Sequence, residues 1–348
     1  AEAVRRYFET WDPSQAAEHE VIREHWEELT DGGNLIFCMN DQEAQDDPAI
    51  RESWNELQAG GGQNADGICL VTGKPAEISR IHRMIKGVPG AQASGAALVS
   101  FNAPAFESYG KEQSYNASVG KYAEFAYTTA LNYLLDQKKY RFQLGDTMIV
   151  YWAESGQEAC QEAFSFTIAP NHDNQEEIHK LFEGLKKQAY IELNDMEIDP
   201  EQKFYILGLA PNAARLSVRF FYEDSFGNIL ENIALHYQNM DIVKPKWEQR
   251  EYLGVREMLD ETANQKSRDK KPISNMAAMV MQAVISGSRY PASLFTDLLI
   301  RIRAEQGALT WGRAAIIKAY LIRNHRWKEG ENDMVLNEKS CDKAYVLG

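Results

Sequence analysis

The feature that most constrains the fold is a change in hydrophobic periodicity near residue 225 of this 348-residue chain. Before it, short runs of β-branched and aromatic residues predict strands at residues 68–71, 97–101, 147–152, 204–209 and 216–222. After Phe226, apolar residues recur three and four positions apart almost throughout, which predicts helices. Grouping strands before helices favours an α+β fold. We expect a mixed, partly antiparallel sheet with helices, followed by a C-terminal helical bundle.

The same patterns predict the helices and a division of the chain. Helices are expected at residues 122–135, 176–190, 229–237, 248–262, 273–285, 292–304 and 313–322. The N-terminal part combines helical spacing with a short strand at residues 35–39 and ends in the polar loop GGGQNADG. We therefore expect an acidic helical segment over residues 1–67, an α+β domain over residues 68–225 and a helical domain over residues 226–348.

Composition and cysteine usage indicate the class of protein. With 44% hydrophobic and 25% charged residues, the chain can bury a real core. No stretch has the pattern of a signal peptide, and no apolar run reaches the about 18 residues that a membrane span needs. The four cysteines lie far apart without a CxxC pair, which is typical of a reducing compartment and indicates no zinc cluster. We expect a cytoplasmic protein without membrane contact.

The net charge of −14 is unevenly distributed along the chain. Residues 1–70 carry 4 basic and 16 acidic side chains, whereas residues 212–328 carry 18 basic and 12 acidic ones. A protein that binds a phosphate backbone needs local Lys and Arg, not a basic total. The C-terminal excess keeps nucleic-acid binding open, and the acidic front is expected to face solvent or a basic subunit.

Residues 82–117 are rich in glycine, serine and amide side chains where a core would be aliphatic. Glycines permit tight turns and close approach of the backbone to a ligand, and the polar side chains supply donors at short intervals. The candidates are Lys86, Gln92, Ser94, Asn102, Ser108, Lys111, Gln113 and Asn116. Composition alone fits an extended polar ligand and a turn-rich surface excursion equally well.

Two further segments are candidates for contact with a nucleic-acid backbone. After the turn at Asn212, Arg215 and Arg219 alternate with apolar residues, which predicts one basic face on a strand. The other reading is an amphipathic strand with its arginines in water. A second candidate is the basic loop of Lys266, Arg268, Lys270 and Lys271. Such a loop could bind single-stranded DNA, but a loop that is only solvated has the same composition.

Catalytic and metal-binding patterns are weak. Cys69 or Ser79 with His82 is the nearest nucleophile–base pairing, but no nucleophile-elbow GxSxG is present and Cys69 reads as a core residue. The histidines are scattered, and an acidic helix start explains the pair His172 and His179 better than a metal site does. We therefore expect no catalytic residue, no metal and no cofactor.

Four long motifs in one order resemble the large subunit of type I-C CRISPR Cascade. They are CLVTGK (69–74), the run 82–117, FYILGLAPNAARLSVRF (204–220) and YPASLFTDLLIRIRAE (290–305). The resemblance extends through YTTALNYLL, GDTMIVYWAE, FGNILENIALHYQ and RAAIIKAYLIRN. It implies that the chain is the central portion of such a protein, without the N-terminal segment and the C-terminal tail, similar to the small subunit, that family members usually have.

The resemblance implies a function and a set of partners. A non-catalytic, DNA-binding subunit would probe duplex DNA for the protospacer-adjacent motif, promote R-loop formation and hold the displaced non-target strand. Its partners would be target double-stranded DNA, the guide-RNA-carrying backbone subunits, the small subunit and a helicase-nuclease. The residues of the run 82–117 would lie near the motif and the basic loop near the non-target strand, unless residues ahead of Ala1 read the motif.

Two alternatives stay open at this point. One is a metal-dependent nuclease acting on the same nucleic acid, for which Asp146, Glu154 and Asp173 are the acidic candidates. The other is a structural bridge between subunits of the complex, in which the polar run packs against protein. A bridge would lack the steep salt dependence that phosphate contacts produce.

Overall fold

The computed structural model describes residues 5–6, 9–31, 36–39, 42–58, 66–171, 173–186, 191–193, 196–264, 275–306 and 309–325. The predicted basic loop, Lys266 to Lys271, lies outside these residues. The contacts of the chain divide it into two units, residues 1–65 and residues 66–348, and each is described by itself.

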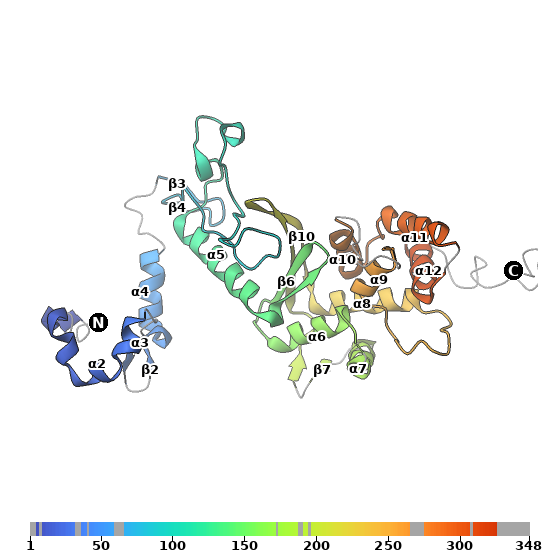
Figure 1. Ribbon diagram of the computed structural model, residues 1–348, viewed down its shortest axis with the longest axis horizontal. Coiled ribbons are helices and arrows are strands. Elements are labelled where there is room, and N and C mark those ends of the chain that lie inside the picture. Colours follow the sequence, from blue (N-terminus) through green and yellow to red (C-terminus); the bar gives the residue numbers. More distant parts are fainter. Residues whose placement is uncertain are drawn as a thin grey trace, which may run out of the picture. The chain divides into compact units, whose positions relative to one another are not determined.

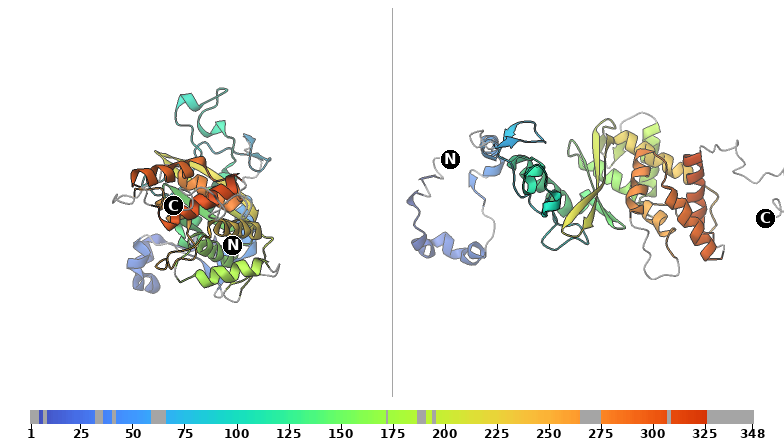
Figure 2. Two further views of the ribbon diagram at one scale, coloured as in Figure 1. Left: turned by 90° about the vertical axis from the view of Figure 1, so that its right-hand side faces the viewer. Right: turned by 90° about the horizontal axis from the view of Figure 1, so that it is seen from above.

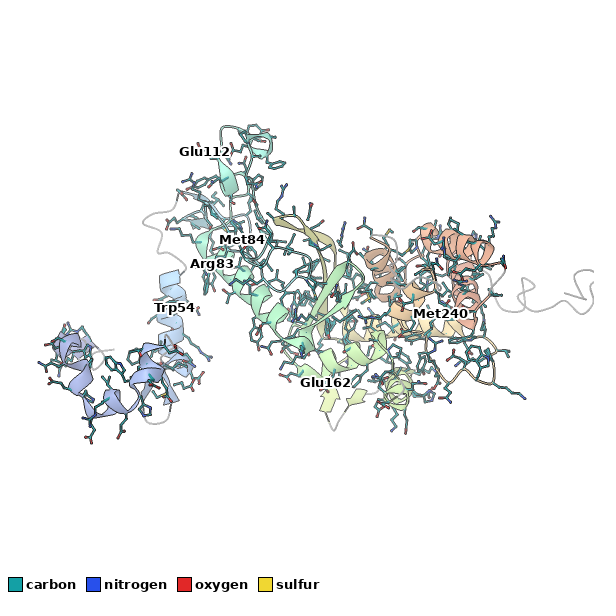
Figure 3. The ribbon with its side chains drawn as sticks, viewed as in Figure 1. Trp54, Arg83, Met84, Glu112, Glu162 and Met240 are labelled. Carbon is teal, nitrogen blue, oxygen red and sulfur yellow. The ribbon has the colours of Figure 1, made fainter. Side chains whose placement is uncertain are left out.

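The first unit consists of short helical elements and one two-residue strand pair. Its elements are η1 (Pro13–Glu18), α2 (Glu20–Glu24), α3 (Trp26–Thr30), β1 (Cys38–Met39), β2 (Gln42–Glu43), η2 (Ala44–Asp46) and α4 (Pro48–Gln58). None of its side chains whose exposure is described is buried. Trp54 on α4, labelled in Figure 3, is 52% exposed. The helical spacing expected in this part is present as α2, α3 and α4, and the strand expected within residues 35–39 is present as β1.

The second unit holds the four-stranded sheet and, among the described residues, every helix of more than 11 residues (Figure 1). Its strands are β3 (Gly67–Ile68), β4 (Pro75–Ala76), β5 (Arg141–Leu144), β6 (Thr147–Ala153), β7 (Ile191–Leu193), β8 (Met196–Ile198), β9 (Lys203–Asn212) and β10 (Arg215–Ser225). Its α-helices are α5 (Lys121–Asp136), α6 (Glu158–Ile168), α7 (Gln175–Lys186), α8 (Phe226–Met240), α9 (Val255–Asp260), α10 (Met276–Ser286), α11 (Ala292–Ala304) and α12 (Trp311–His325). Single 3-10 turns are η4 (Pro104–Phe106), η5 (Gln113–Asn116) and η6 (Lys138–Tyr140).

The main sheet has the strand order β10-β9-β6-β5, and each neighbouring pair is antiparallel. This confirms the α+β class. The strand expected at residues 97–101 is wrong, because only Ala97 pairs, in a parallel bridge to Arg215. Continued parallel pairing would bring Phe101 opposite Arg219, where β10 has a bulge between Val218 and Phe220, and bulges end regular pairing.

The two faces of the sheet are covered by different parts of the chain (Figures 1 and 2). On the first face, Tyr151, Phe204 and Phe220 join a core that continues through α6, α8 and α10 to α11 and α12. The rings of Phe204 and Phe226 lie 5.0 Å apart, so this core crosses residue 225, where the sequence suggests a domain boundary. The boundary itself stays a prediction.

On the second face, the polar run and α5 pack against the sheet. Leu131 and Leu135 of α5 lie in one buried cluster with Ile85, Val88 and Ala96 of the run. The strands contribute alternate residues, such as Val150 and Leu209, to the same cluster, as the two-residue period of a strand requires. A few apolar side chains thus anchor the run, while polar residues such as Lys86 and Gln92 are exposed.

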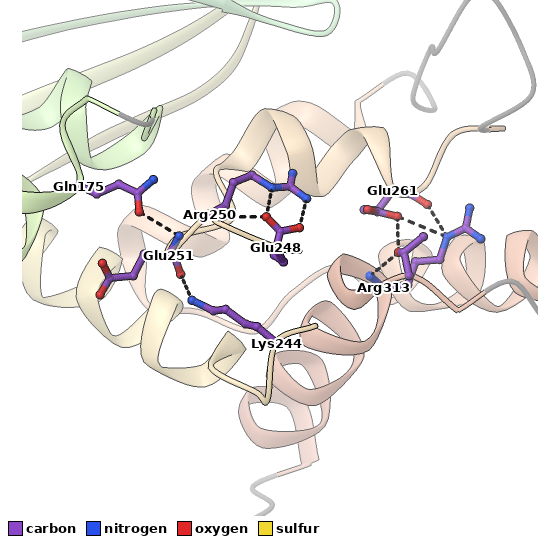
Figure 4. Close-up of polar contacts among 8 residues, drawn as sticks. Gln175, Lys244, Glu248, Arg250, Glu251, Glu261 and Arg313 are labelled. Atoms are coloured by element: carbon purple, nitrogen blue, oxygen red, sulfur yellow. Dashed lines mark hydrogen bonds and ion pairs between the residues drawn. The ribbon is translucent and has the colours of Figure 1, made fainter. Parts of the chain in front are cut away.

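The helical part is held together by a buried arginine (Figure 4). Arg313 of α12 is fully buried, and its Nη1 donates to Oε2 of Glu305 at 2.8 Å. Its Nε donates to the carbonyl oxygen of Glu261 at 3.2 Å. A buried charge needs such partners, because an unpaired buried charge strongly destabilises the folded protein. No helix in the described part of the chain is long and apolar enough to cross a membrane.

Candidate functional site

A recess of about 230 Å³ lies where four separate segments meet. The segments are residues 80–84, 97–102, 113–114 and 214–215. The Ala97 bridge to Arg215 brings the second and fourth of them together. Most of the lining is apolar, and it includes Ile81, Met84, Val99 and Phe101. The recess brings together Asn102, Gln113 and Arg215, three of the residues that the sequence singles out.

Two polar atoms in the lining have no hydrogen-bond partner among the described residues. They are Nε2 of His82 and Oε1 of Gln113. His82 is only 3% exposed, and its Nδ1 lies 2.6 Å from the hydroxyl of Tyr127 on α5. Buried polar groups are nearly always paired, so these two atoms, which lie below the surface of the recess, are exceptions to that rule.

The surroundings of His82 set its protonation. Burial lowers the pKa of His82, and the nearby charge of Glu124 opposes this only in part. Burial raises the pKa of Tyr127 well above its usual value, and Glu124 adds to this. The lowered pKa favours a neutral imidazole, whose Nδ1 shares a hydrogen bond with the Tyr127 hydroxyl.

Two arginines line the same recess. The guanidinium of Arg215 lies 4.7 Å from the ring centre of Phe106, which holds it by a cation–π contact. Arg80 is exposed, and its Nη2 lies 3.8 Å from Oε2 of Glu112, so the ion pair is loose and solvent-screened. Both guanidinium groups therefore remain available to an anionic ligand.

Between Asn102 and Gln113 the run forms a loop, called here the projecting loop. Figure 3 shows Glu112 on this loop, away from Met84. Asn116 closes this loop with both ends of its amide. Its Oδ1 accepts from the N–H of Ser108 at 2.8 Å, and its Nδ2 donates to the carbonyl oxygens of Lys111 at 2.8 Å and Gln113 at 2.9 Å. The Asn116 side chain is thus used within the loop, which the sequence does not reveal.

Tyr109 lies on this loop and is 99% exposed. It has a φ of 53° and is followed by Gly110 at 68°, the left-handed conformation of a tight turn. Such complete exposure is unusual for an aromatic side chain of this size. Sequence reasoning missed Tyr109 as a candidate, although an aromatic residue beside a glycine in a polar run is a usable signal.

The remaining candidates from the run 82–117 lie at the surface. Lys86, Gln92, Ser94, Ser108 and Lys111 are exposed. The N–H of Lys86 donates to Oδ1 of Asn132 on α5 at 2.8 Å, which fixes the backbone there and leaves the ammonium group in water. None of these five lines the recess.

The β9–β10 hairpin does not form one basic face. Asn212 is exposed beside Ala213, which has a φ of 53°. The bulge at Arg219 interrupts the alternation, and bulges re-aim side chains. Arg219 lies 3.6 Å from Oδ2 of Asp146 in the β5–β6 turn, whereas Arg215 lines the recess. The two arginines therefore have different surroundings, contrary to the expected alternation.

The acidic candidates for a nuclease do not form a cluster. Asp146 precedes β6 and Glu154 follows it, so a seven-residue strand of roughly 3.3 Å per residue separates them. Within the described residues, no group of three or more His, Cys, Asp or Glu side chains could hold a metal ion. Cys69 is buried, and the hydroxyl of Ser79 donates to the carbonyl oxygen of Ile81, so neither is paired with His82.

An antiparallel four-stranded sheet with a helical core on one face, and with the polar run and α5 on the other, describes an α+β protein. The chain belongs to the family of CRISPR-associated proteins described as Cas_Csd1, whose family model matches residues 1–348. This confirms the resemblance to the Csd-type large subunit of Cascade. No curated protein matches the chain.

Proposed function

We propose that this chain is the DNA-binding large subunit of a type I-C Cascade complex and that it acts without catalysis. It recognises the protospacer-adjacent motif in duplex DNA, promotes R-loop formation and holds the non-target strand. Sequence along the target is read by the guide RNA. The observation that carries the proposal is the recess, which gathers Asn102, Gln113 and Arg215 beside a projecting loop.

The chemistry of this surface suits the minor groove of DNA. Amide side chains serve the degenerate pattern of donors and acceptors in that groove, and apolar or aromatic wedges open base steps there. Gln92 and Asn102 are exposed amides, and Tyr109 is a fully exposed ring on a loop that Asn116 closes. Lys86, Lys111 and Arg215 then contact phosphates, which positions the subunit without reading sequence.

The helical part of the chain serves the protein partners. Its exposed apolar side chains include Val243, 95% exposed, and Trp247, 73% exposed, both between α8 and α9. Side chains of this kind on a solvent-facing segment favour contact with another protein. We assign this side to the backbone subunits, the small subunit and the helicase-nuclease.

Binding of DNA by the reconstituted complex tests the proposal. Target duplexes with and without the motif are titrated with complexes that contain or lack the subunit, with Mg²⁺ present and cleavage followed in the same samples. Motif-dependent binding without cleavage is expected. Binding that ignores the subunit supports the structural bridge instead, and Mg²⁺-dependent cleavage supports the nuclease.

Salt titration of two variants locates the phosphate contacts. Arg215→Gln removes one cation from the recess. It is expected to reduce the magnitude of the slope of log affinity against log salt concentration by about 1. Lys180→Gln is the control, because Lys180 lies on α7 and pairs with Glu176 at the surface. Equal slopes in wild type and Arg215→Gln, with both variants folded, contradict a phosphate contact at Arg215.

A further inference from the structure

We infer that the open part of the second face of the sheet is a docking site for an arginine-bearing segment of a partner protein. The polar run and α5 cover this face over residues such as Val150 and Leu209. On β10, which ends the strand order, Val218 and Phe221 remain 50% and 53% exposed. The inference goes beyond the proposed function, because it concerns a surface to which that function assigns no partner.

The strand register places Val218 and Phe221 on this face. In the β9–β10 pair, Phe221 lies opposite Leu207 and Val218 lies opposite Leu209. Leu209 belongs to the buried cluster of the second face, and Leu207 packs against that cluster. Residues directly opposite in an antiparallel pair lie on the same side of the sheet. The bulge between Val218 and Phe221 puts these two residues, three positions apart, on one side, where a regular strand would separate them.

Three aromatic rings form a row across neighbouring strands of this face. Trp152 of β6 lies directly opposite Tyr205 of β9, and their ring centres are 5.4 Å apart with planes inclined by 16°. The ring of Phe221 follows at 6.2 Å from that of Tyr205, inclined by 22°. We call these three residues the aromatic row. Phe221 is its most exposed member, and one face of its ring is turned away from Tyr205, so a planar group can stack there.

A row of charged side chains runs beside the aromatic row. Each member is two residues from a member of the aromatic row, and the two-residue period of a strand puts it on the same face; the members are Glu154, Lys203 and Glu223. Nζ of Lys203 lies 2.8 Å from Oε1 of Glu223, and the hydroxyl of Tyr205 donates to Oε1 of Glu154 at 3.4 Å. Two carboxylates and one ammonium group give this charged row a net negative charge.

Aromatic rings next to carboxylates suit a guanidinium group. The faces of aromatic rings attract cations, and arginine is found there more often than lysine. A carboxylate accepts two parallel hydrogen bonds from a guanidinium group. Phe221 and Glu223 are two residues apart on β10, which separates them by roughly 7 Å. An arginine of a partner that lies over the ring of Phe221 therefore also reaches Glu223.

The charges decide against a single-stranded nucleic acid at this place. A row of aromatic rings can also stack against bases, but such sites combine the rings with a positively charged groove along the backbone. Lys203, the cation of the charged row, already pairs with Glu223, and Arg219 in the bulge lies 3.6 Å from Asp146. Phosphates would meet the two carboxylates of the charged row, whereas a basic protein segment is attracted by them.

Photo-cross-linking in the reconstituted complex tests the inference. Photoreactive benzoylphenylalanine replaces Phe221 in the full chain, and the cross-linked peptides are identified by mass spectrometry. We expect a cross-link to a segment of another protein subunit that contains an arginine. The control places the same probe at Tyr122, a 38% exposed aromatic residue of α5, which should not cross-link to that segment. A cross-link from position 221 to DNA, to RNA or to this chain itself overturns the inference.

The affinity of the subunit for a complex assembled without it measures the two kinds of contact. Phe221→Leu keeps an apolar side chain and removes the ring, so the dissociation constant should rise about 2- to 5-fold, as expected for an exposed cation–π contact. Glu223→Gln removes a carboxylate and should weaken assembly by an amount that shrinks as salt is added. Tyr122→Leu makes the same exchange of an aromatic residue for leucine on α5 and should leave the dissociation constant unchanged.

The arginine identified by cross-linking completes the test. Its replacement by glutamine should weaken assembly, and Phe221→Leu should then add little, because the ring no longer has a cation to contact. Additive effects of the two changes contradict the inference, as does the absence of a cross-link from position 221. A dissociation constant that stays at the wild-type value in both Phe221→Leu and Glu223→Gln contradicts it too.

These outcomes are independent of the proposed function. Assembly is measured without target DNA, so a complex that binds DNA without regard to the motif overturns the proposed function and leaves the docking site to be judged by assembly. Conversely, motif-dependent DNA binding by a complex whose assembly ignores the aromatic row and the charged row leaves the proposed function standing and removes the docking site.

Discussion

Replacing Asn116 by alanine distinguishes a residue that reads DNA from one that shapes the loop. Asn116 makes three hydrogen bonds to the backbone of its own loop, and each contributes about 1 kcal/mol net. Asn116→Ala should therefore destabilise the closed loop by about 3 kcal/mol, a factor of roughly 100 in its closing equilibrium. Because the loop is exposed and joins no core cluster, the free energy of global unfolding should change little.

Hydrogen exchange measures this effect directly. The N–H groups of Ser108 and Lys111, which are bonded inside the loop, should exchange up to about 100 times faster in Asn116→Ala. Binding must then order the loop, so DNA affinity of the complex should fall by no more than the same factor. Asn116→Asp keeps the acceptor for the N–H of Ser108 and loses both donated hydrogen bonds. The same two amides should therefore exchange at least as fast in Asn116→Asp as in the wild type.

One pattern of results would refute this reasoning. If Asn116→Ala weakens DNA binding strongly while exchange at Ser108 and Lys111 keeps its wild-type rate, the side chain contacts DNA itself and the loop does not depend on it. Faster exchange together with unchanged affinity would instead show that the loop does not take part in binding.

Three further predictions concern stability. Arg313→Met leaves two largely buried glutamates, 14% and 9% exposed, without their cation and should cost about 3–5 kcal/mol in denaturant unfolding; a loss under 1 kcal/mol would show that the network is dispensable. Gly208→Ala places a Cβ 2.5 Å from the ring of Phe220 and should lower the melting temperature, with Gly184→Ala, where a Cβ meets nothing, as the control. His236 has a pKa of about 3 because it is buried and faces the charge of Arg323. Since the unfolded chain takes up that proton below about pH 6.5 and the folded chain does not, stability should fall by about 2 kcal/mol from pH 6.5 to 5, and His236→Phe should flatten this slope.

The strands and helices with a clear period could be predicted from the sequence. The ranges expected for β6, β9, β10 and α11 match the structure to within a few residues, because the three strands are rich in β-branched and aromatic residues and the helix has apolar residues three and four positions apart. Helix α6 was missed, since it is buried on most sides between the sheet and α8 and so carries apolar residues without a clear stripe. Periodicity indicates an element only where one side of it faces water.

The recess itself could not be predicted, because it depends on pairing between distant residues. His82 and Gln113 come together in the lining of the recess only after the chain folds. The bridge from Ala97 to Arg215 is a single residue pair. The bulge at Arg219 likewise depends on β9, where Gly208 makes room for the ring of Phe220. Composition singled out the run that contributes most of this lining, but it could not rank the residues within the run.

The main core and the polar run lie on opposite faces of the sheet. The larger core lies on the first face and extends into the helices, whereas the second face anchors the polar run through a small cluster that includes Ile85 and Ala96. Gly95 lets the run pass closely, since a Cβ there would lie 2.8 Å from that of Met84. Side chains of the run that point to solvent can therefore change without loss of the main core. A run built in this way stays rigid enough to position a ligand although it contains almost no regular secondary structure.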